Sequence, residues 1–176
     1  MTKNIKKSDV TAAAKSNKYA YILTVIPAGI VDWAALQTLW LAATGGKLTS
    51  QVPLLTGSST DDFKTIECKG DTIVPVINAG EAPTDGKAEI SGTVEGINDK
   101  SLEWAYGAQG TENIVIAERC SDGTKLIFAN PCTGGLVFQY QSIGGQDGGS
   151  AGISFKFTGA DCPVPMLVYA PAAVQS

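Results

Sequence analysis

The chain has 176 residues, a formal net charge of −4 and only 17% charged residues, which fits a single domain with a weakly charged surface. The acidic balance argues against tight binding to nucleic-acid phosphates, because such binding needs clustered Lys and Arg. The sequence has no histidine, so the commonest general base and metal ligand is missing, and we expect no enzyme activity, no cofactor and no metal site. Catalysis by paired carboxylates, Lys or Tyr stays open.

The cysteines give no support for a structural zinc site, because none of them stands in a C-x-x-C pair. They are Cys68, Cys120, Cys132 and Cys162. The basic first residues lack the apolar segment of a signal peptide, and no apolar run is long enough to span a bilayer. We therefore expect synthesis in the cytoplasm, with reduced and packed thiols. A disulfide formed after release from a cell is the alternative.

The first part of the chain predicts an arm, a strand and a helix. Residues 1–18 are polar and basic, and we expect a flexible N-terminal arm followed by one domain over 19–176. Residues 19–26 are β-branched and aromatic, which favours a buried strand. Residues 32–44 have a possible N-cap in Asp32 and a glycine pair at the end, which predicts a helix. Its apolar face, Trp33, Leu36, Trp40 and Ala43, predicts packing on a sheet, and binding of a partner is the alternative.

A long loop is predicted over residues 45–62, which are rich in Gly, Ser and Thr and show little periodicity. Long loops inside compact domains are uncommon and often functional. This loop carries an apolar patch over 52–55 that looks exposed, so we expect the loop to contact a neighbouring subunit. An ordinary surface loop is the alternative. The candidate interface residues here are Lys47, Leu48, Val52, Leu54 and Leu55.

The rest of the chain predicts strands, which occupy residues 63–68, 72–77, 87–95, 113–120, 125–129, 136–142, 152–158 and 166–169. Ser121-Asp122-Gly123 indicates a tight hairpin turn, because Asp-Gly readily supplies a positive φ. Residues 98–107 fit a strand or a capped helix, and we favour the helix. With roughly eight strands and one main α-helix, the chain is predicted to be mainly β (α+β), as a β-sandwich or barrel-like domain flanked by that helix.

The glycine-rich run GGQDGGSAG at 144–152 predicts a connection between two strands or a contact between subunits. It lacks the pattern of a phosphate-binding loop and opens no helix. Its candidate interface residues are Gln146 and Asp147. The adjacent Asp61 and Asp62 lack the spacing of a calcium loop, so we interpret them as a solvated turn.

The order of elements from residue 87 to residue 171 carries a family resemblance. A strand (KAEISGTVEG) is followed by a short helical element (DKSLEWAYG) and a hairpin (IVIAERCSDGTKLIFANP). A strand–glycine loop–strand unit (LVFQYQSIGGQDGGSAGISFKFTG) and an apolar strand (PMLVYAP) complete it. This order resembles the tail tube proteins of long-tailed bacteriophages, the major tail protein-like family, which is related to the tube proteins of contractile injection systems.

The resemblance implies a structural virion protein that assembles with copies of itself. A β-sandwich flanked by a helix would form a homo-oligomeric ring, expected to be hexameric, and rings would stack into a hollow tube. Genomic DNA would pass through the tube without specific binding. The protein would be made in the bacterial host cytoplasm, reside in the virion tail, contact other tail proteins and not enter a membrane.

Two other functions fit the same composition. One is a capsid decoration or head–tail connector protein, which would bind a different lattice. The other is a carbohydrate- or receptor-binding β-sandwich, and exposed aromatic side chains would favour this function. Trp33, Trp40 and Trp104 could supply them, but the first two fall on the apolar face of the predicted helix, where burial is expected.

Overall fold

The computed structural model describes residues 21–43, 46–66, 68, 72–78, 86–145 and 152–172. Within these ranges ten strands and two α-helices form a mainly-β fold, which confirms the predicted α+β class. The predicted N-terminal arm, Gln146 and Asp147 lie outside the described residues. None of the described helices is long and apolar enough to cross a membrane.

The strands form one large sheet with two halves, and the first half-sheet has the order β3-β1-β6-β7-β10-β2. Neighbouring strands are antiparallel, except that β2 runs parallel to β10. The strands are β1 (Tyr21–Pro27), β2 (Lys47–Leu48), β3 (Lys64–Ile66), β6 (Glu112–Arg119), β7 (Lys125–Phe128) and β10 (Met166–Tyr169).

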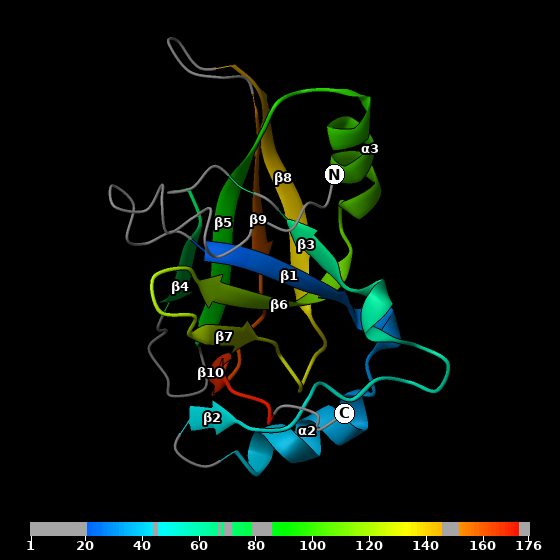
Figure 1. Ribbon diagram of the computed structural model, residues 1–176, viewed down its shortest axis with the longest axis vertical. Helices are drawn as coiled ribbons and strands as arrows, with labels where there is room; N and C mark the ends of the chain where they lie inside the picture. The colour runs from blue at the N-terminus through cyan, green and yellow to red at the C-terminus, as the bar shows by residue number, and fades with distance from the viewer. Residues whose placement is uncertain are drawn as a thin grey trace.

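The second half-sheet has the antiparallel order β8-β9-β5-β4. Its strands are β8 (Leu136–Gly144), β9 (Gly152–Thr158), β5 (Lys87–Glu95) and β4 (Val74–Asn78). The two halves join where Glu112 and Asn113 of β6 pair with the beginning of β8. In Figure 1 the strands of the second half-sheet run up and down, whereas β1, β6 and β7 run across them. The sheet therefore turns a corner at the β6–β8 junction.

Two buried apolar clusters lie on opposite faces of the first half-sheet. The first cluster joins the two half-sheets in the manner of a sandwich. It includes Leu23, Val25, Val115 and Ala117 from the first half-sheet and Ala88, Ile90, Phe138, Phe155 and Phe157 from the second. The second cluster lies between the first half-sheet and helix α2 (Trp33–Leu41). It includes Ile26, Val31, Leu36, Trp40, Leu48, Val52, Ile114, Ile116, Ile127 and Leu167.

Local hydrogen bonds explain where the two helices begin. The Asp32 carboxylate accepts a hydrogen bond from the amide of Ala35 at 3.1 Å, so the predicted N-cap of α2 is confirmed. Helix α3 (Asp99–Ala108) begins with a capping box, in which Asn98 and Ser101 each accept the other's amide hydrogen at 2.9 Å. The favoured helix over 98–107 is thus confirmed, and the described fold has two α-helices where one main helix was predicted.

Candidate assembly surface

Strand β4 forms an open edge of the second half-sheet. It pairs with β5 along one side, and no described strand pairs with its other side. Val74 is 49% exposed and Val76 is 39% exposed. Val74 and Val76 are two positions apart, so their side chains lie on the same face of the strand. An open edge that presents apolar side chains is a template for pairing with another chain.

The outward face of the second half-sheet is polar and belongs to neither buried cluster. Its side chains alternate with the buried ones along β5 and β9. They include Glu89, Ser91 and Thr93 from β5 and Ser154, Lys156 and Thr158 from β9, all of them half-buried. Hydroxyl and mixed charged groups in these positions suit a face that stays in contact with water.

The other described edges are shorter or covered, which sets β4 apart. Strand β3 has three residues and β2 has two, whereas β4 has five. The edge of β8 is covered at Phe138 by hydrogen bonds of 2.9 Å with the backbone of Gly110 and Thr111. Beside it, the side-chain oxygen of Gln109 accepts a hydrogen bond from the amide of Tyr140 at 3.1 Å. Short or covered edges are a usual protection against unwanted pairing, whereas β4 is longer and no described strand covers its outer side.

Two residues of the predicted interface loop are buried in this chain's own core, while its other described residues are half-buried or exposed. Leu48 is 2% exposed and Val52 is 6% exposed, and both pack in the cluster beneath α2. The exposed apolar patch expected over residues 52–55 is therefore wrong for Val52, and Leu48 is not available to a neighbour in this structure. Lys47 is exposed at the start of β2, Leu54 is half-buried and Leu55 is 47% exposed.

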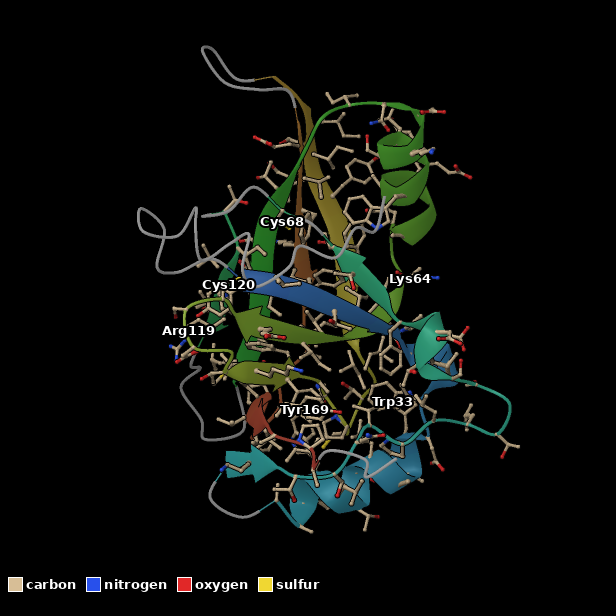
Figure 2. The ribbon with its side chains drawn as sticks, in the orientation of Figure 1. Trp33, Lys64, Cys68, Arg119, Cys120 and Tyr169 are labelled. Atoms are coloured by element: carbon tan, nitrogen blue, oxygen red, sulfur yellow. The ribbon has the colours of Figure 1, made fainter. Side chains whose placement is uncertain are left out.

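Hydrogen bonds of its backbone hold this loop against neighbouring parts of the chain. Leu54 forms a β-bridge with Val31, and the amide of Leu55 donates to the carbonyl oxygen of Ile30 at 2.9 Å. The amide of Val52 donates to the hydroxyl oxygen of Tyr169 at 3.4 Å, and burial raises the pKa of that hydroxyl. Figure 2 shows Tyr169 on β10, between the sheet and α2. These contacts fix residues 52–55 against the rest of the chain, while Lys47, Leu55 and most of residues 56–62 remain exposed.

The acidic turn that follows has a local role. The carboxylate of Asp62 accepts a hydrogen bond from the amide of Ser59 at 3.0 Å, and the Ser59 hydroxyl accepts from Asp61 at 3.2 Å. These bonds cap the short 3-10 helix over Thr60–Asp62. In the part of the chain that the structure describes, no group of three or more His, Cys, Asp or Glu could hold a metal ion.

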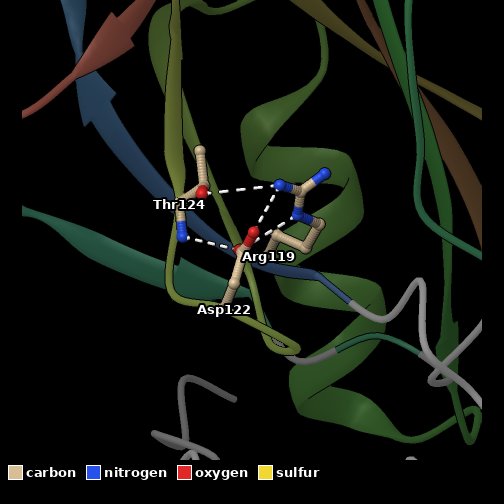
Figure 3. A network of polar contacts seen from close by, with 3 residues as sticks. All are labelled: Arg119, Asp122 and Thr124. Carbon is tan, nitrogen blue, oxygen red and sulfur yellow. Dashed lines mark hydrogen bonds and ion pairs between the residues drawn. The ribbon is translucent and has the colours of Figure 1, made fainter.

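The β6–β7 hairpin is fixed by a small polar network (Figure 3). The guanidinium of Arg119 donates to the Asp122 carboxylate, with an Nε to Oδ1 distance of 3.0 Å. That carboxylate also accepts a hydrogen bond from the amide of Thr124 at 2.9 Å. Hydrogen bonding from Arg119 holds the pKa of Asp122 well below its ordinary value. Gly123 has a φ of 72°, as predicted for the Asp-Gly turn.

A cleft of about 670 Å³ is lined in part by residues of α3 and β3. Figure 1 shows these two elements on the side of the molecule away from β4. Its apolar lining includes Ile66, Trp104, Phe138 and Phe157, and Lys64, Lys100 and Glu103 also line it. The side chain of Lys64 points away from the sheet in Figure 2. Trp104 packs edge-on against Phe138 and Phe155, with ring centroids 5.1 and 5.7 Å apart, so it is half-buried against the first cluster.

Sequence reasoning missed the β4 edge, although the segment Val-Pro-Val-Ile carried a signal. A proline within a strand favours an edge position, because it cannot donate to the ladder. The sequence predicted the strand itself but not its place in the sheet. That place depends on pairing with β5, which a local pattern does not specify.

Comparison of the chain with known proteins gave no match to a family model, to a curated protein or to a solved structure.

Proposed function

We propose that the protein is a structural virion component that assembles with copies of itself into rings, and that these rings stack into the hollow tail tube of a bacteriophage. The order of elements over residues 87–171, which resembles that of tail tube proteins, is the source of this proposal. Other tail proteins would contact the ends of the tube. DNA would pass through it without specific binding.

The open β4 edge is the observation that carries the proposal. Val74 and Val76 expose apolar surface beside backbone groups that no described strand pairs, and a strand of a second copy would cover this surface and pair these groups. A soluble monomer usually protects such an edge with charge, proline or a covering segment. Strand β4 contains Pro75 but no charged side chain.

A ring needs a head-to-tail contact, in which one surface of a copy meets a different surface of the next. Strand β4 and helix α3 lie on opposite sides of the molecule in Figure 1, as such a contact requires. On the α3 side, β3 pairs only with β1 among the described strands, so the other side of β3 can take a strand of the next copy. We infer that β4 of one copy meets the α3 side of the next.

The charge of the chain supports the passage of DNA rather than its capture. The formal net charge is −4, and the outward face of the second half-sheet mixes Glu89 with Lys156 among hydroxyl groups. Tight binding to phosphates needs clustered cations and the release of counterions. A wall of this composition would not hold DNA.

Negative-stain electron microscopy of the purified full-length protein over a concentration series tests the proposal. Rings of uniform diameter, and tubes built from them at higher concentration, are the expected images. Single small particles at every concentration would overturn spontaneous tube formation. They would favour the decoration or connector protein, which needs another lattice.

A further inference from the structure

Two surface connections are clamped together by one buried side chain, that of Asn130, which is 1% exposed. Its amide nitrogen donates to the carbonyl oxygens of Ala160 and Asp161, both at 3.3 Å. Its oxygen accepts a hydrogen bond from the amide of Cys132 at 3.1 Å. The β7–β8 connection, which holds Cys132, is thereby fixed against the β9–β10 connection, which holds Cys162.

The clamp brings two thiols together in different environments. Cys132 is exposed, whereas Cys162 is 1% exposed, and the two side chains are within hydrogen-bonding reach of each other. The backbone of Cys162 is fixed by a hydrogen bond of 2.9 Å from its amide to the carbonyl oxygen of Gly86. Burial raises the pKa of the Cys162 thiol, so Cys132 is the group that an oxidant meets first.

We propose that Cys132 and Cys162 are a site of oxidative modification, at which a disulfide forms when the folded protein meets a low-molecular-weight disulfide such as oxidised glutathione. The Cys132 thiolate attacks one sulfur of oxidised glutathione, breaks its S–S bond and releases one glutathione thiolate. The Cys162 thiol then loses its proton and attacks the Cys132 sulfur, which releases the second glutathione. The protein loses two electrons and two protons, and glutathione disulfide gains them.

The bond would close the loop that contains β8 and β9, because both strands lie between the two cysteines. A cross-link over such a loop restricts the unfolded chain. We expect oxidation to raise the melting temperature by about 10 °C, since closing a loop of this size has a large effect in a chain of this length.

The test is to incubate the native protein with oxidised glutathione, block free thiols, digest the protein and identify linked peptides by mass spectrometry. The expected product joins the Cys132 and Cys162 peptides within one chain, with a mass lower by two hydrogens. A reductant should restore both thiols and reverse the rise in melting temperature. A Cys162→Ala variant should instead accumulate a glutathione adduct on Cys132.

Two comparisons make the result specific. Cys132→Ser should abolish the cross-link and the gain in melting temperature, while Thr133→Ser, a change at the exposed neighbouring residue, should leave both intact. Cross-links between chains through Cys132, or a glutathione adduct that persists in the native protein without a Cys132–Cys162 bond, would overturn the proposal.

Discussion

Gly135 lies at the corner where the two half-sheets meet. A Cβ atom built on it would lie 2.6 Å from both the backbone nitrogen and the carbonyl oxygen of Asn113, far inside a normal contact. Asn113 pairs with Leu136, which directly follows the glycine. The close approach of β6 to the start of β8 therefore requires a residue without a side chain at this position.

Replacing Gly135 with alanine should reduce the free energy of unfolding by about 1 to 3 kcal/mol, because backbone must move to admit the methyl group. Chemical denaturation followed by circular dichroism measures the change. Gly29→Ala is the matched control, since a Cβ there meets nothing within 4 Å. Equal losses of stability in the two variants would show that the corner does not depend on this contact.

Asp122 predicts a pH dependence of the β6–β7 hairpin. Its pKa is lower in the folded chain than its ordinary value of 3.8, so the ion pair with Arg119 stabilises the fold above that value. The stabilisation is lost as the pH falls through the lower folded pKa. It should be small, because the pair is exposed to solvent.

Titration of the Asp122 carboxyl by NMR checks this directly. The wild-type carboxyl should stay ionised well below the pH at which a free Asp protonates. Arg119→Gln should move the pKa back toward its ordinary value, because the charged hydrogen-bond donor is lost. An unchanged titration in that variant would mean that Arg119 does not set the pKa.

Single residues also show what the sequence could reveal locally. The Asp122-Gly123 pair predicted the hairpin turn because the conformational preference of glycine acts within the turn itself. The partnership of Arg119 with Asp122 was not predicted, since it depends on how the hairpin folds back. The same holds for Gly135, whose role becomes visible only when β6 lies beside β8.

At the scale of elements, local signals predicted most of the fold. The bounds of β5, β9 and β10 match the predicted strands, and Asp32 begins α2 as expected. Helix α2 ends at Leu41, before the predicted end at residue 44. Strand β2 was not predicted, because a two-residue strand has no periodicity and forms through pairing with β10, far along the chain.

The burial of Leu48 gives a prediction about the loop that was expected to form an interface. Leu48→Ala should cost about 2 to 5 kcal/mol of unfolding free energy, because it leaves a cavity beneath α2. Leu55→Ala should change it by less than about 0.5 kcal/mol, since that side chain is half exposed. Denaturant titrations of both variants measure the difference. A neutral Leu48→Ala would restore the segment as an exposed interface loop.

Strand β4 gives the prediction that concerns assembly. Val76→Lys should raise the protein concentration needed for assembly at least about tenfold, because a charged side chain on an exposed edge strand disfavours pairing with another chain. The stability of the single chain should stay within about 0.5 kcal/mol, since the site is on the surface. Light scattering over a dilution series measures assembly.

Val164→Lys is the matched control, because Val164 is 45% exposed and Val76 is 39% exposed. Val164 lies between β9 and β10, outside both β4 and the α3 side. The control should assemble at the wild-type concentration. If the two variants behave alike, general surface hydrophobicity rather than the β4 edge controls the association.

At the scale of the whole molecule, the first half-sheet is the central layer. The second half-sheet packs on one of its faces and α2 on the other, so both faces of β1 and β6 are buried. This leaves the second half-sheet with a polar outward face and an open β4 edge. Composition indicated a weakly charged, assembling protein, but the location of that edge depends on long-range strand pairing that the sequence pattern does not encode.

The proposed function requires that the folded chain associates with copies of itself through a head-to-tail contact. Sedimentation velocity of the full-length protein over a concentration series at physiological salt measures this association. We expect a shift from monomer to a closed species of fixed mass that is several times that of the 18.2 kDa chain, followed by larger stacks. A single monomeric species over the whole series would contradict it.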